Sequence, residues 1–135
     1  YRAGSTFSTS GLEAYRAGHA VCRDFAHMGI TFCRGLSLPA RYVCGYLPDI
    51  GVPFDPNPMD FHAWFEVYLE GAWHTFDARH NQPRTGRVVI ATGRDAADIA
   101  FLTNHWADLI LLDLQVIAVV DQLPVDDVRT LVQLS

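Results

Sequence analysis

The chain has 135 residues, half of them hydrophobic, and a formal net charge of −5 at pH 7. This composition is typical of a globular domain, and the sequence has no basic run that could hold a phosphate backbone, which argues against a nucleic-acid partner. No apolar run reaches the length of a membrane-spanning helix, so we expect no membrane association.

The sequence contains three cysteines and no CxxC pair. This pattern argues against a disulfide framework or a zinc knuckle and favours a reducing compartment, so we expect a cytoplasmic protein. The chain starts at Tyr1 rather than at a methionine, and we therefore expect residues 1–135 to be a single core domain of a longer protein.

The first predicted element is a short helix. Ser10 and Glu13 have the spacing of a capping box, in which each side chain satisfies a backbone N–H of the other residue. The helix should run to about Ala17 and end at Gly18, because glycine readily adopts the left-handed conformation that terminates helices.

Apolar residues at helical spacing predict a longer helix over 22–36, with Cys22 in its first turn and facing the buried side. Unpaired backbone N–H groups and the positive end of the helix dipole favour the thiolate there, which is the nucleophilic form. A lone cysteine is more often a small core residue, and Cys33 and Cys44 are interpreted in that way. Cys22 is a candidate nucleophile only if the chain also supplies a base and an orienting acid.

Several strands should follow. Residues 41–47 are rich in β-forming side chains, whereas 48–58 hold four prolines and predict a long loop, either a lid or a plain surface excursion. The alternating segments 61–69 and 72–78 flank Glu70-Gly71, which predicts a tight hairpin.

The remaining segments are less regular. Residues 86–91 predict another strand, and 93–100 predict a short turn of helix. Residues 108–121 are a long strand candidate, and Pro124 could open a terminal helix.

The hairpin provides a test for partners of Cys22. If Glu70-Gly71 forms the turn, His62 and Asp77 become diagonal neighbours on one face, with backbones about 7 Å apart. A hydrogen bond between them would fix the imidazole tautomer and leave the other nitrogen free for a thiol. A helix laid across that face would bring Cys22 to His62.

The opposite face of the hairpin is the more apolar one, so we expect both faces to be covered. Its members are Phe61, Ala63, Phe65, Val67, Leu69 and Phe76.

Other histidines are weaker candidates. His74 alternates onto the wrong face of the hairpin, and His27 falls on the polar side of its helix. His80 could line the site or be an ordinary polar residue at a loop end. A zinc site of Cys22, His62 and His80 is conceivable, but no ligand spacing supports it.

Three blocks of sequence resemble the transglutaminase-like superfamily, in its bacterial form. The likeness covers most of residues 1–100. The blocks are VCRDFAH with its helix and LPARYVCGYL (21–47), DFHAWFEVYLEGAWHTFDARHN (60–81) and GRVVIATGRDAADIA (86–100).

The resemblance implies an α+β fold, with a papain-like core in which the cysteine-bearing helix packs on an antiparallel β-sheet. It also implies Cys22 as nucleophile, His62 as general base and acid, and Asp77 as orienting carboxylate. Such families use an additional oxyanion donor upstream of the cysteine, but none of the 21 residues before Cys22 is Trp, Gln or Asn. The backbone N–H of Cys22 is one candidate donor.

The leading functional hypothesis is a cysteine acyltransferase that acts on glutamine or peptide amides through a thioester. The alternatives are a cysteine peptidase or amidase and, in a different class, a non-catalytic binding domain that retains the fold. We expect a protein or peptide substrate, no cofactor and no metal. The sequence contains no calcium loop of the D-x-D-x-D-G type.

Overall fold

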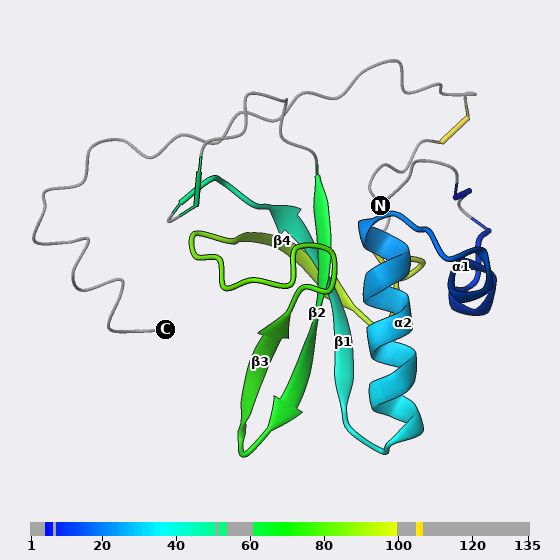
Figure 1. The fold of residues 1–135 in the computed structure, drawn as a ribbon, viewed down its shortest axis with the longest axis horizontal. Helices are drawn as coiled ribbons and strands as arrows, with labels where there is room; N and C mark the ends of the chain where they lie inside the picture. Colours follow the sequence, from blue (N-terminus) through cyan, green and yellow to red (C-terminus); the bar gives the residue numbers. More distant parts are fainter. Residues whose placement is uncertain (1–4, 7, 51, 54–60, 100–104, 107–135) are drawn as a thin grey trace, which may run out of the picture.

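The computed structural model describes residues 5–6, 8–50, 52–53, 61–99 and 105–106. These residues form an α+β fold with two helices and one four-stranded antiparallel sheet in the order β3-β2-β1-β4 (Figure 1). This confirms the predicted fold class. The elements are α1 (Gly11–Ala17), α2 (Cys22–Gly35), β1 (Ala40–Tyr46), β2 (His62–Leu69), β3 (Ala72–Phe76) and β4 (Val88–Gly93).

Several predictions fall outside the described residues. They concern the strand at 108–121, the helix opening at Pro124 and most of the loop at 48–58. The single domain over 1–135 therefore stays a prediction. Neither described helix is long and apolar enough to cross a membrane.

Helix α1 begins and ends as its sequence predicts. The Ser10 hydroxyl accepts the Glu13 N–H at 3.2 Å, and the Glu13 carboxylate accepts the Ser10 N–H at 2.8 Å. Gly18 ends the helix with φ 70°, in the left-handed region. The capping box and the glycine stop are both confirmed.

The hairpin has the predicted turn and register. Glu70 and Gly71 have φ values of 50° and 88°, as a tight two-residue hairpin requires. Leu69 pairs with Ala72, and the pairing continues in step to the last residue of β3. Strand β4 begins two residues later than predicted, and residues 94–99 form turns and bends in place of the predicted turn of helix.

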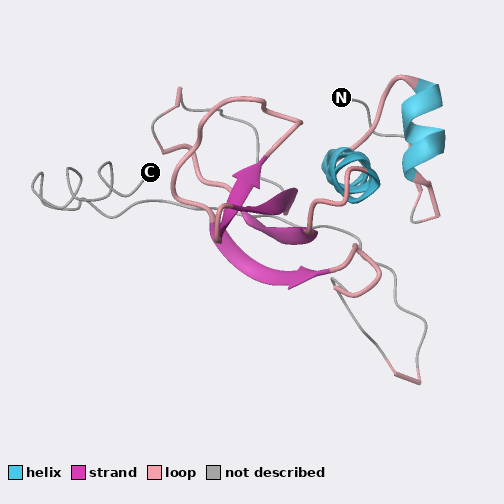
Figure 2. Ribbon diagram, turned by 90° about the horizontal axis from the view of Figure 1, so that it is seen from below, coloured by secondary structure: helices cyan, strands magenta, loops and turns pink. Residues whose placement is uncertain are grey.

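Helix α2 covers the apolar face of the sheet, the face opposite to the one on which His62 lies. Figure 2 shows both helices on one side of the strands. The ring of Phe65 packs so closely on the helix that a Cβ at Gly29 would overlap it. The core on this face consists of Ala26, Ile30, Tyr42, Cys44, Ala63, Phe65 and Val67.

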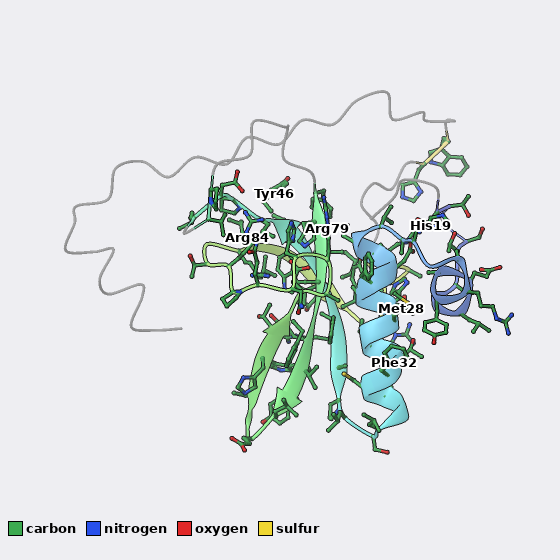
Figure 3. The ribbon with its side chains drawn as sticks, viewed as in Figure 1. His19, Met28, Phe32, Tyr46, Arg79 and Arg84 are labelled. Carbon is green, nitrogen blue, oxygen red and sulfur yellow. The ribbon has the colours of Figure 1, made fainter. Side chains whose placement is uncertain are left out.

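The prediction that the helix crosses the His62 face is therefore wrong. Cys22 and His62 are instead the first residues of α2 and β2, and both elements begin at the same end of the sheet (Figure 1). Helix α2 packs on the apolar face of β2 because the side chains of Ala63, Phe65 and Val67 bury more hydrocarbon surface against it. Helix α2 ends at Gly35, one residue before the predicted end, and Phe32 and Leu36 near its end are 60% and 73% exposed. Met28 and Phe32 project from α2 toward α1 (Figure 3).

The second face of β2 is covered as well. His62 and Trp64 are only 2% and 1% exposed. The segment that connects β3 to β4 supplies the cover: its Arg87 guanidinium lies 5.4 Å from the centre of the Trp64 ring. Strand β2 is thus buried on both sides, as expected from its two apolar faces.

Candidate active site

Cys22 is the first residue of α2 and is half-buried against the core. The backbone N–H groups of a first helical turn have no acceptor within the helix, so they favour a negative charge nearby. Tyr42 lies beside this thiol. Burial raises the pKa of the Tyr42 phenol, and the charge of Cys22 raises it further. Cys22 therefore occupies the predicted position, with its sulfur on the core side of the helix start.

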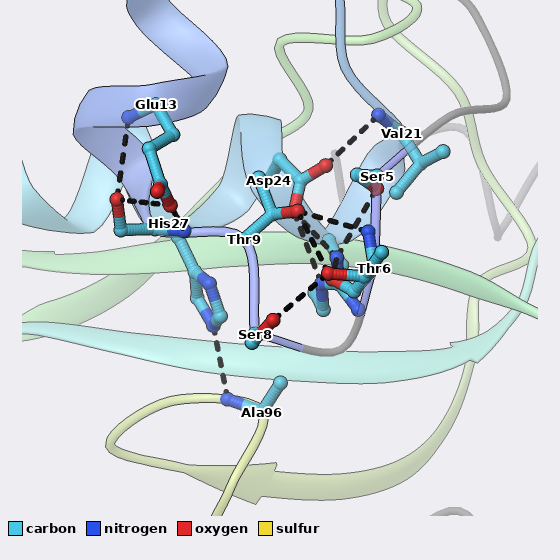
Figure 4. Close-up of polar contacts among 11 residues, drawn as sticks. Ser5, Thr6, Ser8, Thr9, Glu13, Val21, Asp24, His27 and Ala96 are labelled. Atoms are coloured by element: carbon cyan, nitrogen blue, oxygen red, sulfur yellow. Dashed lines mark hydrogen bonds and ion pairs between the residues drawn. The ribbon is translucent and has the colours of Figure 1, made fainter.

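A buried ion pair fixes the backbone at the start of α2 (Figure 4). Asp24 is fully buried and accepts the Val21 N–H at 3.2 Å. Its other oxygen accepts two hydrogen bonds from Arg23, at 3.0 and 2.8 Å. Arg23 in turn donates to the Thr6 carbonyl at 2.6 Å. Its carboxylate turns inward and takes the place of the side-chain cap that Val21 lacks.

His62 and Asp77 form the hydrogen bond that the hairpin register predicts. The distance from His62 Nε2 to Asp77 Oδ2 is 2.7 Å, and both side chains are 3% exposed. A carboxylate only accepts, so Nε2 carries the proton. His62 Nδ1 is buried and has no hydrogen-bond partner among the described residues. Its lone pair is therefore available to accept a proton.

Four further donors hold the Asp77 carboxylate. The backbone N–H groups of Arg79 and His80 donate to Oδ1 at 3.1 and 3.4 Å. His80 Nδ1 and Arg87 Nη2 donate to Oδ2 at 3.0 and 3.3 Å. With its oxygens bonded in this way, the carboxylate has a fixed orientation toward His62.

The electrostatics of the pair favour a neutral imidazole beside an ionised carboxylate. Burial lowers the pKa of His62, against the opposing effect of the hydrogen bond that it donates to Asp77. Burial alone would raise the pKa of Asp77, but the hydrogen bonds and charges of His62 and His80 outweigh it and hold that pKa well below its usual range. At neutral pH the unbonded ring nitrogen can thus act as a base.

Two residues of this site were not identified, or not favoured, in the sequence. Arg87 was not singled out, although it lies in a block that resembles the family, and His80 was weighed only as a possible lining residue. The ring centroid of His80 is 4.9 Å from that of His62. Both residues belong to the irregular connection between β3 and β4, where no periodicity indicates which way a side chain points.

One group of side chains among the described residues has the geometry to hold a metal ion. It consists of His62, Asp77 and His80, whose ligand atoms lie within 4.8 Å of one another. These side chains already bond to one another through Asp77 Oδ2. This hydrogen bonding accounts for the short distances among the three side chains. The expectation that the protein binds no metal stays a prediction.

A cavity of about 760 Å³ lies between α2, β1 and the turns after β4, and its lining includes Tyr42 and Phe61. His27 also lines it and accepts the Ala96 N–H through Nε2 at 3.1 Å (Figure 4). Burial lowers the pKa of His27, and the charge of Arg23 lowers it further. His27 is therefore a structural link between α2 and the turns after β4.

The chain is similar to known proteins. Residues 2–78 match the model of the transglutaminase-like superfamily, a range that includes Cys22, His62 and Asp77. An uncharacterized protein of Mycobacterium leprae (strain TN) is 30% identical in an alignment of 121 residues that covers 85% of this chain and 42% of that protein. The crystal structure of a candidate cysteine protease from Cytophaga hutchinsonii is similar with a TM-score of 0.64 and 52% identity, over 74% of this chain and 33% of that one. The chain thus spans less than half the length of either protein.

Proposed function

Because the chain belongs to the transglutaminase-like superfamily, a family of cysteine-dependent enzymes, we propose that it carries out acyl transfer from a carboxamide. In this proposal Cys22 is the nucleophile, His62 the general base and acid, and Asp77 the carboxylate that orients His62. The substrate is a protein or peptide that presents a glutamine side chain or a peptide amide.

The observation that supports this proposal most is the pairing of His62 with Asp77, which leaves Nδ1 buried and without a partner. Nδ1 takes the proton of the Cys22 thiol, and the resulting thiolate attacks the amide carbon. The imidazolium then protonates the departing nitrogen as the C–N bond breaks, and an acyl thioester remains on Cys22. Water or a second amine then attacks the thioester carbon while Nδ1 removes its proton. The C–S bond breaks, and the proton returns from Nδ1 to the Cys22 sulfur.

Hydrolysis is the second candidate outcome. It is favoured by the 52% identity to a candidate cysteine protease. Both outcomes share the thioester and differ in whether water or an amine reaches it faster. A non-catalytic binding domain is the alternative from a different class, and the complete Cys22, His62 and Asp77 set argues against it.

We place this chemistry in a reducing compartment such as the cytoplasm. Cys33 and Cys44 are free thiols, and a thiol nucleophile such as Cys22 is kept active by a reducing environment.

The test is mass spectrometry of a glutamine peptide incubated with the protein and a primary amine. Transamidation adds the mass of the amine less ammonia, deamidation converts the amide to an acid, and cleavage shortens the peptide. Cys22→Ala is the control. If wild-type protein and Cys22→Ala give the same spectra, with no product in either, the binding-domain alternative is favoured over the enzyme.

A further inference from the structure

Arg87 bridges the two groups that flank the imidazole of His62. Its Nη2 donates to Asp77 Oδ2 at 3.3 Å, on the same oxygen that accepts from His62. Its guanidinium also lies 5.4 Å from the centre of the Trp64 ring, and that ring stacks on the imidazole of His62 with centroids 6.1 Å apart. The Arg87 side chain is 14% exposed.

A second hydrogen bond fixes the direction of the guanidinium. Arg87 Nη1 donates to the Arg84 carbonyl at 3.0 Å. The planar fork of an arginine can satisfy a backbone acceptor and a carboxylate together, whereas a lysine is a single point donor. The contact with Asp77 therefore has a defined geometry.

We propose that Arg87 is a positioning residue: it holds the Asp77 carboxylate and the Trp64 indole against His62, so that the imidazole stays neutral with its proton on Nε2. This inference rests on the proposed function. Two electrostatic effects act in the same direction. The guanidinium offsets part of the charge of Asp77, and it also repels a proton on the nearby ring. Arg87 thereby opposes the imidazolium form, while the hydrogen bond to Asp77 selects the tautomer.

Arg84 offers a matched control. It lies on the same connection between β3 and β4, and its side chain is 7% exposed (Figure 3). Its Nη2 donates to the Pro48 carbonyl and to the carboxylate of Asp49. Replacing Arg84 thus removes a guanidinium that is even less exposed from the same segment but leaves the Asp77 oxygens with their donors.

The experiment measures the ring nitrogens and ring protons of His62 by NMR across pH in four forms of the protein: wild type, Arg87→Gln, Arg87→Lys and Arg84→Gln. Wild type and Arg84→Gln should show the Nε2–H tautomer. In Arg87→Gln, we expect the Nδ1–H tautomer to appear as well and the pKa of His62 to rise. Arg87→Lys keeps the charge, so its His62 pKa should lie closer to wild type.

Amide turnover is the second readout. We expect Arg87→Gln to lose about 10- to 100-fold, the range found for groups that orient a functional histidine from behind, and Arg84→Gln to lose much less. Arg87→Lys should recover part of the loss, because it restores the charge but not both hydrogen bonds.

The inference is overturned if His62 has the same tautomer and pKa in Arg87→Gln as in Arg84→Gln. If thermal melts show that Arg87→Gln does not fold, Arg87→Lys decides: wild-type turnover in that variant means that the two-bond geometry is not needed. The NMR comparison requires no activity. Turnover that persists in Cys22→Ala would therefore overturn the proposed function, while the spectra still decide the role of Arg87.

Discussion

The imidazole of His62 and the carboxylate of Asp77 lie 2.7 Å apart on adjacent strand ends of one hairpin. The bond uses Nε2 and leaves Nδ1 buried without a partner among the described residues. Because the carboxylate has four donors besides His62, its orientation toward the ring is fixed. A histidine fixed in this way is ready to accept a proton at one defined atom.

The first prediction concerns thiol reactivity. Cys22 should react with iodoacetamide near neutral pH faster than Cys33 or Cys44, because it starts a helix and, in the proposed mechanism, is deprotonated by His62. Burial raises the pKa of Cys44, which slows that thiol further. Competitive labelling followed by peptide mapping measures all three rates. Equal rates would contradict an activated thiol at Cys22.

Removing the orienting carboxylate should affect rate more than binding. We expect Asp77→Ala to lower turnover by a factor on the order of 10⁴, since the His62 tautomer is no longer fixed. The matched control is Asp98→Ala, which removes an aspartate of the exposed pair with Arg94. Steady-state kinetics on one amide substrate test this. A turnover in Asp77→Ala equal to that of the control would be the opposing outcome.

Asp24 should matter for stability. Its loss leaves the Val21 N–H and the Arg23 guanidinium without their buried acceptor, and we expect Asp24→Ala to lower the free energy of unfolding by about 2 to 3 kcal/mol. Denaturant unfolding measures the change, with Asp98→Ala again as the control, for which little change is expected. Equal stabilities of the two variants would show that the buried pair does not hold the start of α2.

Stability should also depend on the protonation of His62. Burial lowers its pKa in the folded chain below the unfolded value of 6.5, so the unfolded chain binds the proton more readily. The contribution of neutral His62 to the free energy of unfolding is thus fully present above about pH 6.5. It is lost as the pH falls toward the pKa that His62 has in the folded chain. We expect the melting temperature to fall on acidification through this window.

Substitutions show how much of the pH dependence of the melting temperature comes from His62 and how much from other titrating groups. In His62→Gln the fall in melting temperature should be smaller, whereas His74→Gln, at an exposed position of β3, should behave like wild type. His27 adds a fall of the same sign, since burial lowers its pKa too. Identical pH profiles for wild type and His62→Gln would contradict the assignment.

Local sequence signals were sufficient for the hairpin and for the His62–Asp77 contact. Two residues with positive φ at Glu70 and Gly71 define the turn, and strict alternation then determines which side chains share a face. The capping box at Ser10 likewise depends on residues three apart in the sequence. Such features follow from neighbours along the chain, so a single sequence predicts them.

Long-range packing was not predictable in the same way. Strand β2 carries large apolar side chains on both faces, Trp64 on one and Phe65 on the other, so alternation could not decide which face α2 covers. His80 and Arg87 reach Asp77 from an irregular connection, where neither period of 2 nor period of 3.6 applies. Their roles depend on how that connection folds back over the sheet.

The central claim is that Cys22 is the nucleophile, and Cys22→Ala tests it most directly. The measurement is turnover of one amide substrate by wild type, Cys22→Ala and the matched variant Cys33→Ala, with a thermal melt of each. We predict that Cys22→Ala loses all turnover and melts close to wild type, because the half-buried thiol contributes little packing, while Cys33→Ala stays active. Turnover retained in Cys22→Ala would contradict the account, and so would an unfolded Cys22→Ala, which would make Cys22 a core residue.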